Sequence, residues 1–250
     1  SRPSPGICSA MLSTLRNPTF RHLFAAQLVA LLGTGLATVA LGLLAWQLAG
    51  DTAGAVLGTA LAIKMVAYVT LAPVAAAIAE RLPRRAFLVA LDLIRAGVIA
   101  CLPFVDQVWQ VYVLIFALQA ASAGFTPAFQ AVIPDVLKDE GDYTNALSLL
   151  RLAEDLEQLA SPILAALLLT VVSFPVLFAG TVAGFVASAL LVVTARLPDR
   201  ARAEGSHFWA DVTKGVRIYT ATPRLRGLMV MEAAVAAAGA MVYVNTVVLV

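Results

Sequence analysis

Charged side chains interrupt two long apolar stretches of the sequence, and these residues are the strongest candidates for binding a ligand or a proton. Lys64 lies near the middle of residues 54–79, which hold no other charged residue. A charge inside lipid is costly, so an intramembrane cation predicts a functional or a paired group. Lys64 can bind an anionic group of a substrate or act with a transported proton. The alternative is an ion pair within a helix bundle.

A second group forms a polar stripe on a predicted helix over 145–170. At 100° per residue the stripe contains Arg151, Glu154, Asp155 and, at its edge, Glu157. Arg151 can pair with Asp155 one turn away, which leaves Glu154 and Glu157 without a local cation. Such a carboxyl group can take up a proton on one side of a membrane and release it on the other. The alternative is that this end of the helix projects into water.

Other polar residues inside apolar stretches have more ordinary explanations. Asp92 and Arg95 are three residues apart on one helix face, so we expect a structural ion pair, with a conformational charge relay as the alternative. Further polar side chains line one face of each of two helices, where they can face a cavity or hydrogen-bond between helices; they are Gln27, Thr34, Thr38, Gln119 and Ser122.

No sequence motif indicates an enzyme or a metalloprotein. The chain has two cysteines and two histidines, and it lacks a Cys/His cluster, a phosphate-binding loop and a nucleophile elbow. We therefore expect no catalytic residue, metal or bound cofactor.

The composition shows what kind of protein must position these residues. The chain has 250 residues, of which 61% are hydrophobic and only 13% charged, and its mean hydropathy is +0.90. A soluble domain has about twice that charged fraction. Apolar runs long enough to cross the ~30 Å hydrocarbon core recur, which predicts helices over 23–49, 54–79, 86–105, 109–133, 145–170, 174–195 and from 227 onward.

The positive charges fall on alternate connections. Of the seventeen Lys and Arg residues, all but Lys64 and Arg95 lie at or next to the N-terminal tail or the second, fourth and sixth connections. The positive-inside rule then places the N-terminus and these connections in the cytoplasm. Because the basic residues lie along membrane edges, nucleic-acid binding is not expected.

These patterns divide the chain into four parts. Residues 1–18 form a polar cytoplasmic tail, and 19–196 form a six-helix bundle. Residues 197–226 form a cytoplasmic linker, in which apolar residues from Phe208 to Tyr219 are spaced as in an amphipathic helix. Residues 227–250 begin a seventh helix. On the first helix we expect Gly33, Gly35 and Gly42 to permit close packing, and Trp46 to anchor its end.

The connection between the second and third helices resembles a family motif. Residues 76–88 read A-A-I-A-E-R-L-P-R-R-A-F-L. They are similar to the loop motif of the major facilitator superfamily, G-x-L-a-D-R-x-G-R-R-x-x-L, with Ala76 and Pro83 in place of the two glycines. Residues 125–162 also resemble a pattern, f-x-P-A, i-P-d, a-N-a-l and G-P, of the exporter branch that contains siderophore and macrolide efflux proteins. Ser161 stands at the last glycine.

The resemblance implies an all-α membrane protein. The chain would be the six-helix N-terminal half of a twelve-helix fold plus the start of helix 7, with the C-terminal half of the same transporter as its partner. Helices 1, 2, 4 and 5 would line a central cavity. The switch loop would lock one state by pairing across the two halves; its residues are Glu80, Arg81, Arg84 and Arg85, with Asp92 and Arg95 behind them.

The function implied is a secondary transporter of the inner membrane. We expect it to export a small organic molecule by alternating access, driven by a transmembrane proton gradient and surrounded by membrane lipids. The pathway residues would be Lys64, Glu154, Glu157, Asp155, Gln27, Thr34, Thr38 and Gln119. A lipid translocator of the same fold and a non-transporting receptor or scaffold are the alternatives.

Overall fold

The computed structural model describes residues 14–79, 81–195 and 197, together with 217, 221–223, 225–228, 230–231 and 234. Contacts divide the chain into two units, Ser1–Arg202 and Ala203–Val250. In the second unit all described residues except Thr222 are helical. The predicted linker helix, most of the seventh span, residues 1–13 and Glu80 lie outside the described residues.

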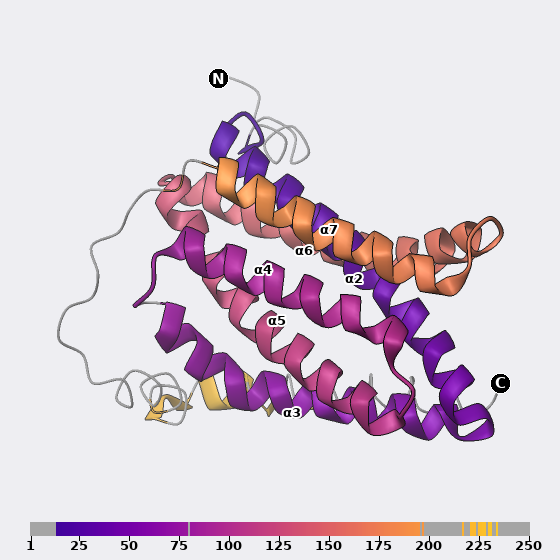
Figure 1. Cartoon of the computed structure of the whole chain (residues 1–250). Helices are drawn as coiled ribbons and strands as arrows, with labels where there is room; N and C mark the ends of the chain where they lie inside the picture. Colours follow the sequence, from indigo (N-terminus) through magenta and orange to yellow (C-terminus); the bar gives the residue numbers. More distant parts are fainter. Residues whose placement is uncertain are drawn as a thin grey trace. The chain divides into compact units, whose positions relative to one another are not determined.

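Six long helices make up the described part of the first unit, and no strand occurs among its described residues (Figure 1). Short 3-10 turns, η1 (Gly50–Thr52) and η2 (Leu102–Phe104), follow the first and third of them. The long helices are α2 (Pro18–Ala49), α3 (Ala53–Ala79), α4 (Arg84–Cys101), α5 (Val108–Val136), α6 (Glu140–Leu169) and α7 (Phe174–Thr194).

The six predicted helices of this unit are confirmed, but two begin five residues earlier than predicted. The Asn17 side chain accepts hydrogen bonds from the backbone N–H groups of Thr19 and Phe20, at 3.0 and 3.2 Å, so α2 begins at Pro18. The Asp139 carboxylate caps α6 in the same way. Hydropathy alone misses these first turns because a capped turn outside the lipid needs no apolar residues.

Four stretches of the described residues are long and apolar enough to cross a membrane. They are Pro18–Tyr68, which contains α2 and most of α3, and Arg84–Phe104, Val108–Val136 and Phe174–Thr194. Helix α6 is not among them, because its last 18 residues include three carboxylates. At ~1.5 Å per residue its 30 residues still extend over about 45 Å, more than the hydrocarbon core requires.

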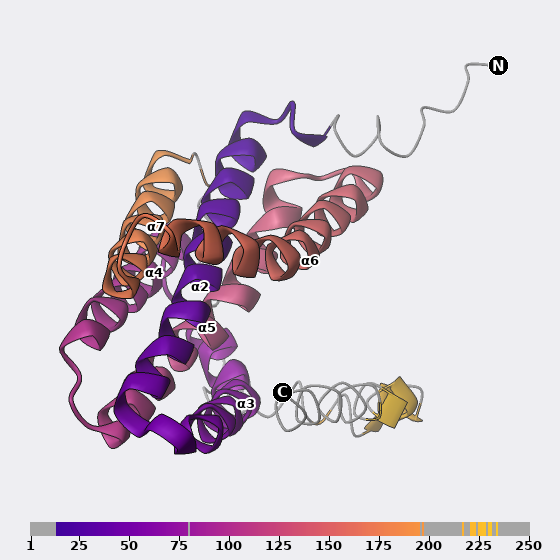
Figure 2. The same cartoon turned by 90° about the vertical axis from the view of Figure 1, so that its right-hand side faces the viewer.

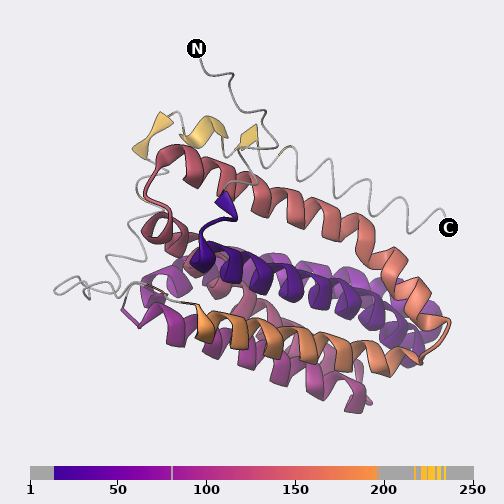
Figure 3. The same ribbon diagram turned by 90° about the horizontal axis from the view of Figure 1, so that it is seen from above.

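The helices pack as two related sets of three. Helix α2 packs against α6 and α7, and α5 packs against α3 and α4; α4 and α7 join the two sets. Figure 2 shows α2 between α6 and α7, and in Figure 3 α6 and α7 again lie on opposite sides of α2. Since α2–α4 and α5–α7 exchange equivalent contacts, the unit has the arrangement of paired three-helix repeats.

We call the end where α2, α4 and α6 begin the basic end, because Arg81 lies just before α4, and Arg84 and Arg85 are its first two residues. One apolar cluster, with Phe20, Leu88 and Ile133 at its centre, fills this end. A second, which includes Ile99 and Phe178, fills the opposite half. The helices are therefore held together at both levels by side-chain packing.

Glycines allow α2 to approach α7 closely. A Cβ atom at Gly33 would lie 3.3 Å from the backbone oxygen of Thr181, and one at Gly184 would lie 3.1 Å from that of Val29. The Thr181 hydroxyl donates to the Gly33 carbonyl at 2.8 Å. The predicted packing role is thus confirmed for Gly33. Among the described residues it is wrong for Gly42, where a Cβ would meet none of their atoms within 4 Å.

Candidate functional site

The polar stripe on α6 separates into a solvated part and a buried part. Arg151 forms ion pairs with Glu154, at 3.2 Å, and with Asp155, at 3.6 Å. The Arg151 side chain is 72% exposed, so this end of the stripe is accessible. The prediction that Glu154 lacks a cation is wrong, because on a helix an arginine reaches residues three and four positions ahead equally well.

Glu157 lies deeper in α6 and has different surroundings. It comes twelve residues before Leu169, or about 18 Å from that end of the helix. The Ser161 hydroxyl donates to its Oε1 atom at 2.8 Å. Among the described residues no Lys, Arg or His nitrogen lies within 4.0 Å of the Glu157 carboxylate. The predicted lack of a local cation therefore holds for Glu157.

The Glu157–Ser161 pair lies directly against α2 at Gly35. A Cβ atom built on Gly35 would be 1.8 Å from Ser161 Oγ, 2.3 Å from Ser161 Cβ and 2.4 Å from Glu157 Oε1. Real Cβ atoms essentially never come that close to a neighbour. Residue 35 must therefore be glycine for the pair to lie where it does. The sequence predicted close packing here, but it did not predict which side chains Gly35 admits.

Lys64 lies in the twelfth position of α3, about 17 Å from Ala53, and its side chain is half-buried. No described carboxylate lies within 4.0 Å of its amino group. The structure does not join it to Glu157, so a Lys64–Glu157 ion pair is absent from the described residues. Without a described carboxylate partner, the Lys64 ammonium group could pair with an anionic group of a ligand, one of the roles that the sequence suggested.

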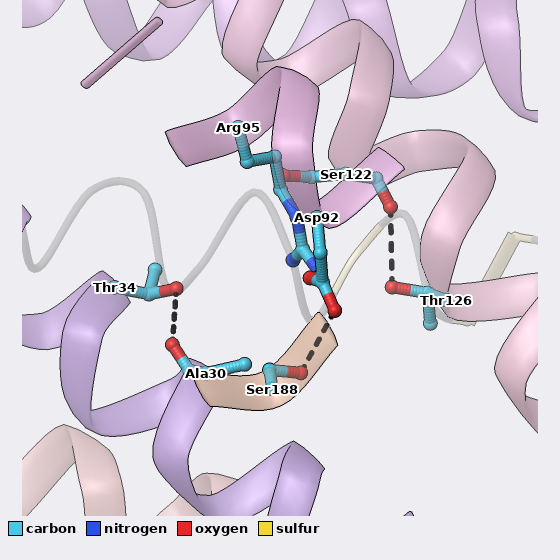
Figure 4. A network of polar contacts seen from close by, with 7 residues as sticks. All are labelled: Ala30, Thr34, Asp92, Arg95, Ser122, Thr126 and Ser188. Atoms are coloured by element: carbon cyan, nitrogen blue, oxygen red, sulfur yellow. Dashed lines mark hydrogen bonds and ion pairs between the residues drawn. The ribbon is translucent and has the colours of Figure 1, made fainter. Parts of the chain in front are cut away.

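Asp92 and Arg95 form the predicted ion pair, and Figure 4 shows Asp92 directed toward Ser188 of α7. Asp92 is 0% exposed and Arg95 6%. The Ser188 hydroxyl of α7 donates to Asp92 Oδ2 at 2.8 Å. The Arg95 guanidinium lies 4.0 Å from the ring centre of Phe125 on α5 and 4.6 Å from that of Phe185 on α7.

This arrangement makes the pair a link between α4, α5 and α7, not a ligand site. Both charges are enclosed, and cation–π contacts and a hydrogen bond replace part of the lost hydration. Sequence spacing predicted the pair, but not Ser188 or the two rings, which lie on other helices.

The switch-loop arginines bind within the six-helix unit. Arg84 forms an ion pair with Asp135 of α5 and donates to the Ala131 carbonyl. Arg85 donates to the Ala195 carbonyl, beyond the end of α7, at 2.8 Å. Arg81 is exposed and has an interaction of its own. The start of α4 is thus fastened to α5 and α7, whereas the predicted pairing across two halves stays untested.

The remaining predicted pathway residues are less closely grouped. Thr34 and Thr38 are exposed, and each hydroxyl donates to a carbonyl of its own helix, at 2.9 and 3.0 Å. Gln27 is half-buried, with its Oε1 atom buried and without a hydrogen-bond partner among the described residues. Gln119 is half-buried on α5. The exposed threonines remain available to a ligand.

Comparison with known proteins agrees with this helical architecture. The sequence profile described as Major Facilitator Superfamily matches residues 23–250. Macrolide efflux protein A of Streptococcus pyogenes is 24% identical over 220 residues, which cover 85% of this chain and 54% of that protein. Macrolide efflux protein A of Enterococcus faecalis is 25% identical over 188 residues, covering 70% of this chain and 58% of that protein.

The chain spans little more than half the length of these curated relatives. The profile nevertheless matches most of the chain, from α2 onward, and the described residues supply the six helices of an N-terminal half. The chain belongs to the Major Facilitator Superfamily, a family of multi-pass membrane transporters.

Proposed function

We propose that the protein is a proton-driven exporter of a small organic molecule in the cell's inner membrane. It would act by alternating access together with a C-terminal half, and its basic end would face the cytoplasm. The observation that carries the proposal is Glu157, a half-buried carboxylate at mid-depth in α6 without a described cation within 4.0 Å. Its Ser161 partner is a neutral hydroxyl.

The two relatives support the export direction and suggest a first substrate to test. Both are named for the efflux of macrolides, at 24% and 25% identity. A macrolide is a mainly apolar organic molecule, and apolar surfaces with a few placed polar groups bind such ligands. Exposed Thr34, exposed Thr38 and half-buried Lys64 would supply polar contacts among the apolar side chains of α2 and α3.

The direct test is transport by the purified protein, expressed from its complete coding sequence, in proteoliposomes. A pH gradient is imposed and uptake of a radiolabelled macrolide is followed, with empty liposomes and a dissipated gradient as controls. The proposal expects accumulation that stops when a protonophore is added. Accumulation that persists without the gradient would contradict proton coupling. Movement of labelled phospholipid between leaflets, without macrolide uptake, would favour a lipid translocator.

A further inference from the structure

We propose that Glu157, Ser161 and Gly35 form a proton-sensitive contact between α6 and α2, through which protonation of Glu157 moves the part of α2 that carries Thr34. The inference rests on the proposed proton-driven export and assigns the place where proton and substrate are coupled. It makes Glu157 the proton-binding group, and it makes Ser161 and Gly35 positioning residues.

Glu157 is isolated from the titratable groups of the neighbouring helices. On α2, which packs against α6, the titratable residues are Arg21 and His22 in the first turn. Helix α7 has none, and those of α5 are Tyr112 and Asp135, near its two ends. At mid-depth the carboxylate therefore faces uncharged helix surfaces.

The charges on α6 itself lie toward the basic end. Glu154 and Asp155 both pair with Arg151, which is largely exposed. Glu157 is 18 residues into the helix and pairs with none of them. One carboxylate of the stripe is thus separated from the solvated network in which Arg151 pairs with the other two.

The hydrogen bond between Ser161 and Glu157 depends on the protonation state of Glu157. Ser161 is 4% exposed, and its hydroxyl donates to the Glu157 carboxylate at 2.8 Å. A hydrogen bond to an ionised carboxylate is roughly twice as strong as one between neutral groups. Proton uptake from water on one side weakens this bond, and release to water on the other side restores it. The only covalent bond that changes is the carboxyl O–H bond, which forms when Glu157 takes up the proton and breaks when it releases it.

A movement of the Glu157 carboxyl group is transmitted to α2 at Gly35. Ser161 and Glu157 approach Gly35 so closely that a Cβ atom there would overlap both. A change in the position of the Glu157 carboxyl group therefore acts directly on the backbone of α2, because Gly35 has no side chain that could absorb the movement. On the other side of α2, Gly33 is held by the Thr181 hydroxyl of α7 at 2.8 Å.

Thr34 lies between these two glycines and is exposed. The segment Gly33–Thr34–Gly35 thus contacts α7 on one side and the Glu157–Ser161 pair of α6 on the other. Any shift at Gly35 changes where the Thr34 side chain is presented. This gives a short physical connection between the carboxyl group and a candidate substrate contact.

The test combines an infrared measurement with transport, in the protein expressed from its complete coding sequence. The carboxylic-acid C=O band is followed in difference spectra between acid and alkaline pH. Glu157→Gln should abolish one band, whereas Asp142→Asn, which removes a carboxyl group from the first turn of the same helix, should leave it. Glu157→Gln should also lose gradient-driven macrolide accumulation and keep downhill exchange, which shows that the variant is folded.

The roles of Ser161 and Gly35 are tested with the C=O band assigned to Glu157. In Ser161→Ala the midpoint, the pH at which half of that band has appeared, should shift by about one unit, which is the effect of a lost hydrogen bond to a charged group. Gly35→Ala should also shift the midpoint, and Gly42→Ala, the matched change on the same helix, should not. A band that persists in Glu157→Gln, or a midpoint equally insensitive to both glycine variants, would overturn the inference. Absence of gradient-driven accumulation in the unmodified protein would instead refute the proposed function.

Discussion

Removing one member of the buried Asp92–Arg95 pair should destabilise the six-helix unit far more than removing both. In Arg95→Met, Asp92 stays 0% exposed and keeps the Ser188 hydroxyl as its described hydrogen-bond donor. An uncompensated buried charge costs roughly 3–5 kcal/mol. The contacts to Phe125 and Phe185, at 4.0 and 4.6 Å, are lost as well, at ~1 kcal/mol each.

The double variant Asp92→Asn/Arg95→Met should recover most of this loss. Asparagine can still accept from Ser188, and methionine fills the space between the two rings without a charge. We therefore expect a coupling free energy of about 2–3 kcal/mol between the two changes. Asp155→Asn is the control, because its ion pair to Arg151 is exposed and should contribute less than ~1 kcal/mol.

The assay is reversible unfolding in mixed micelles of a mild detergent and dodecyl sulfate, followed by circular dichroism. It compares the unmodified protein, Asp92→Asn, Arg95→Met, the double variant and the Asp155→Asn control. The account expects both single variants to unfold at clearly lower dodecyl sulfate fractions than the double variant. If the losses of the single variants simply add in the double variant, the pair is not a coupled buried unit and our interpretation is wrong.

Three further predictions concern other contacts. Gly184→Ala should destabilise the unit by about 1–2 kcal/mol, because its Cβ would lie 3.1 Å from a backbone oxygen, whereas Gly180→Ala, with ordinary contacts, should be nearly neutral in the same unfolding assay. Arg84→Gln and Asp135→Asn should each cost about 1–2 kcal/mol and be non-additive together; strict additivity would show that they act independently. Lys64→Met should change the stability by less than ~1 kcal/mol in the same unfolding assay, because no described carboxylate loses a partner; a large loss of stability would show a structural role instead.

The sequence predicted those features that depend on local pattern. Hydropathy gave the six helices, and spacing gave the Asp92–Arg95 pair, because residues three apart share a helix face. The same local reasoning paired Arg151 with Asp155 alone and left Glu154 without a cation, whereas in the structure Arg151 pairs with both.

Contacts between helices were beyond the sequence pattern. Ser188 is 96 residues from Asp92, and Asp135 is 51 residues from Arg84. Nothing in the periodicity of one helix says which neighbour it meets or at what height. For the same reason Gly35 and Gly42 looked alike in sequence, although only Gly35 faces another helix closely.

The central claim is that the helices cross a membrane and leave the basic end in the cytoplasm. It is tested most directly by thiol labelling in intact cells, after Cys8 and Cys101 are replaced by serine. Single cysteines are placed at Leu82, between α3 and α4, and at Asp106, between α4 and α5. The account predicts that a membrane-impermeant maleimide labels position 106 in intact cells and position 82 only after lysis. Labelling of position 82 in intact cells, or equal labelling of both positions, would contradict it.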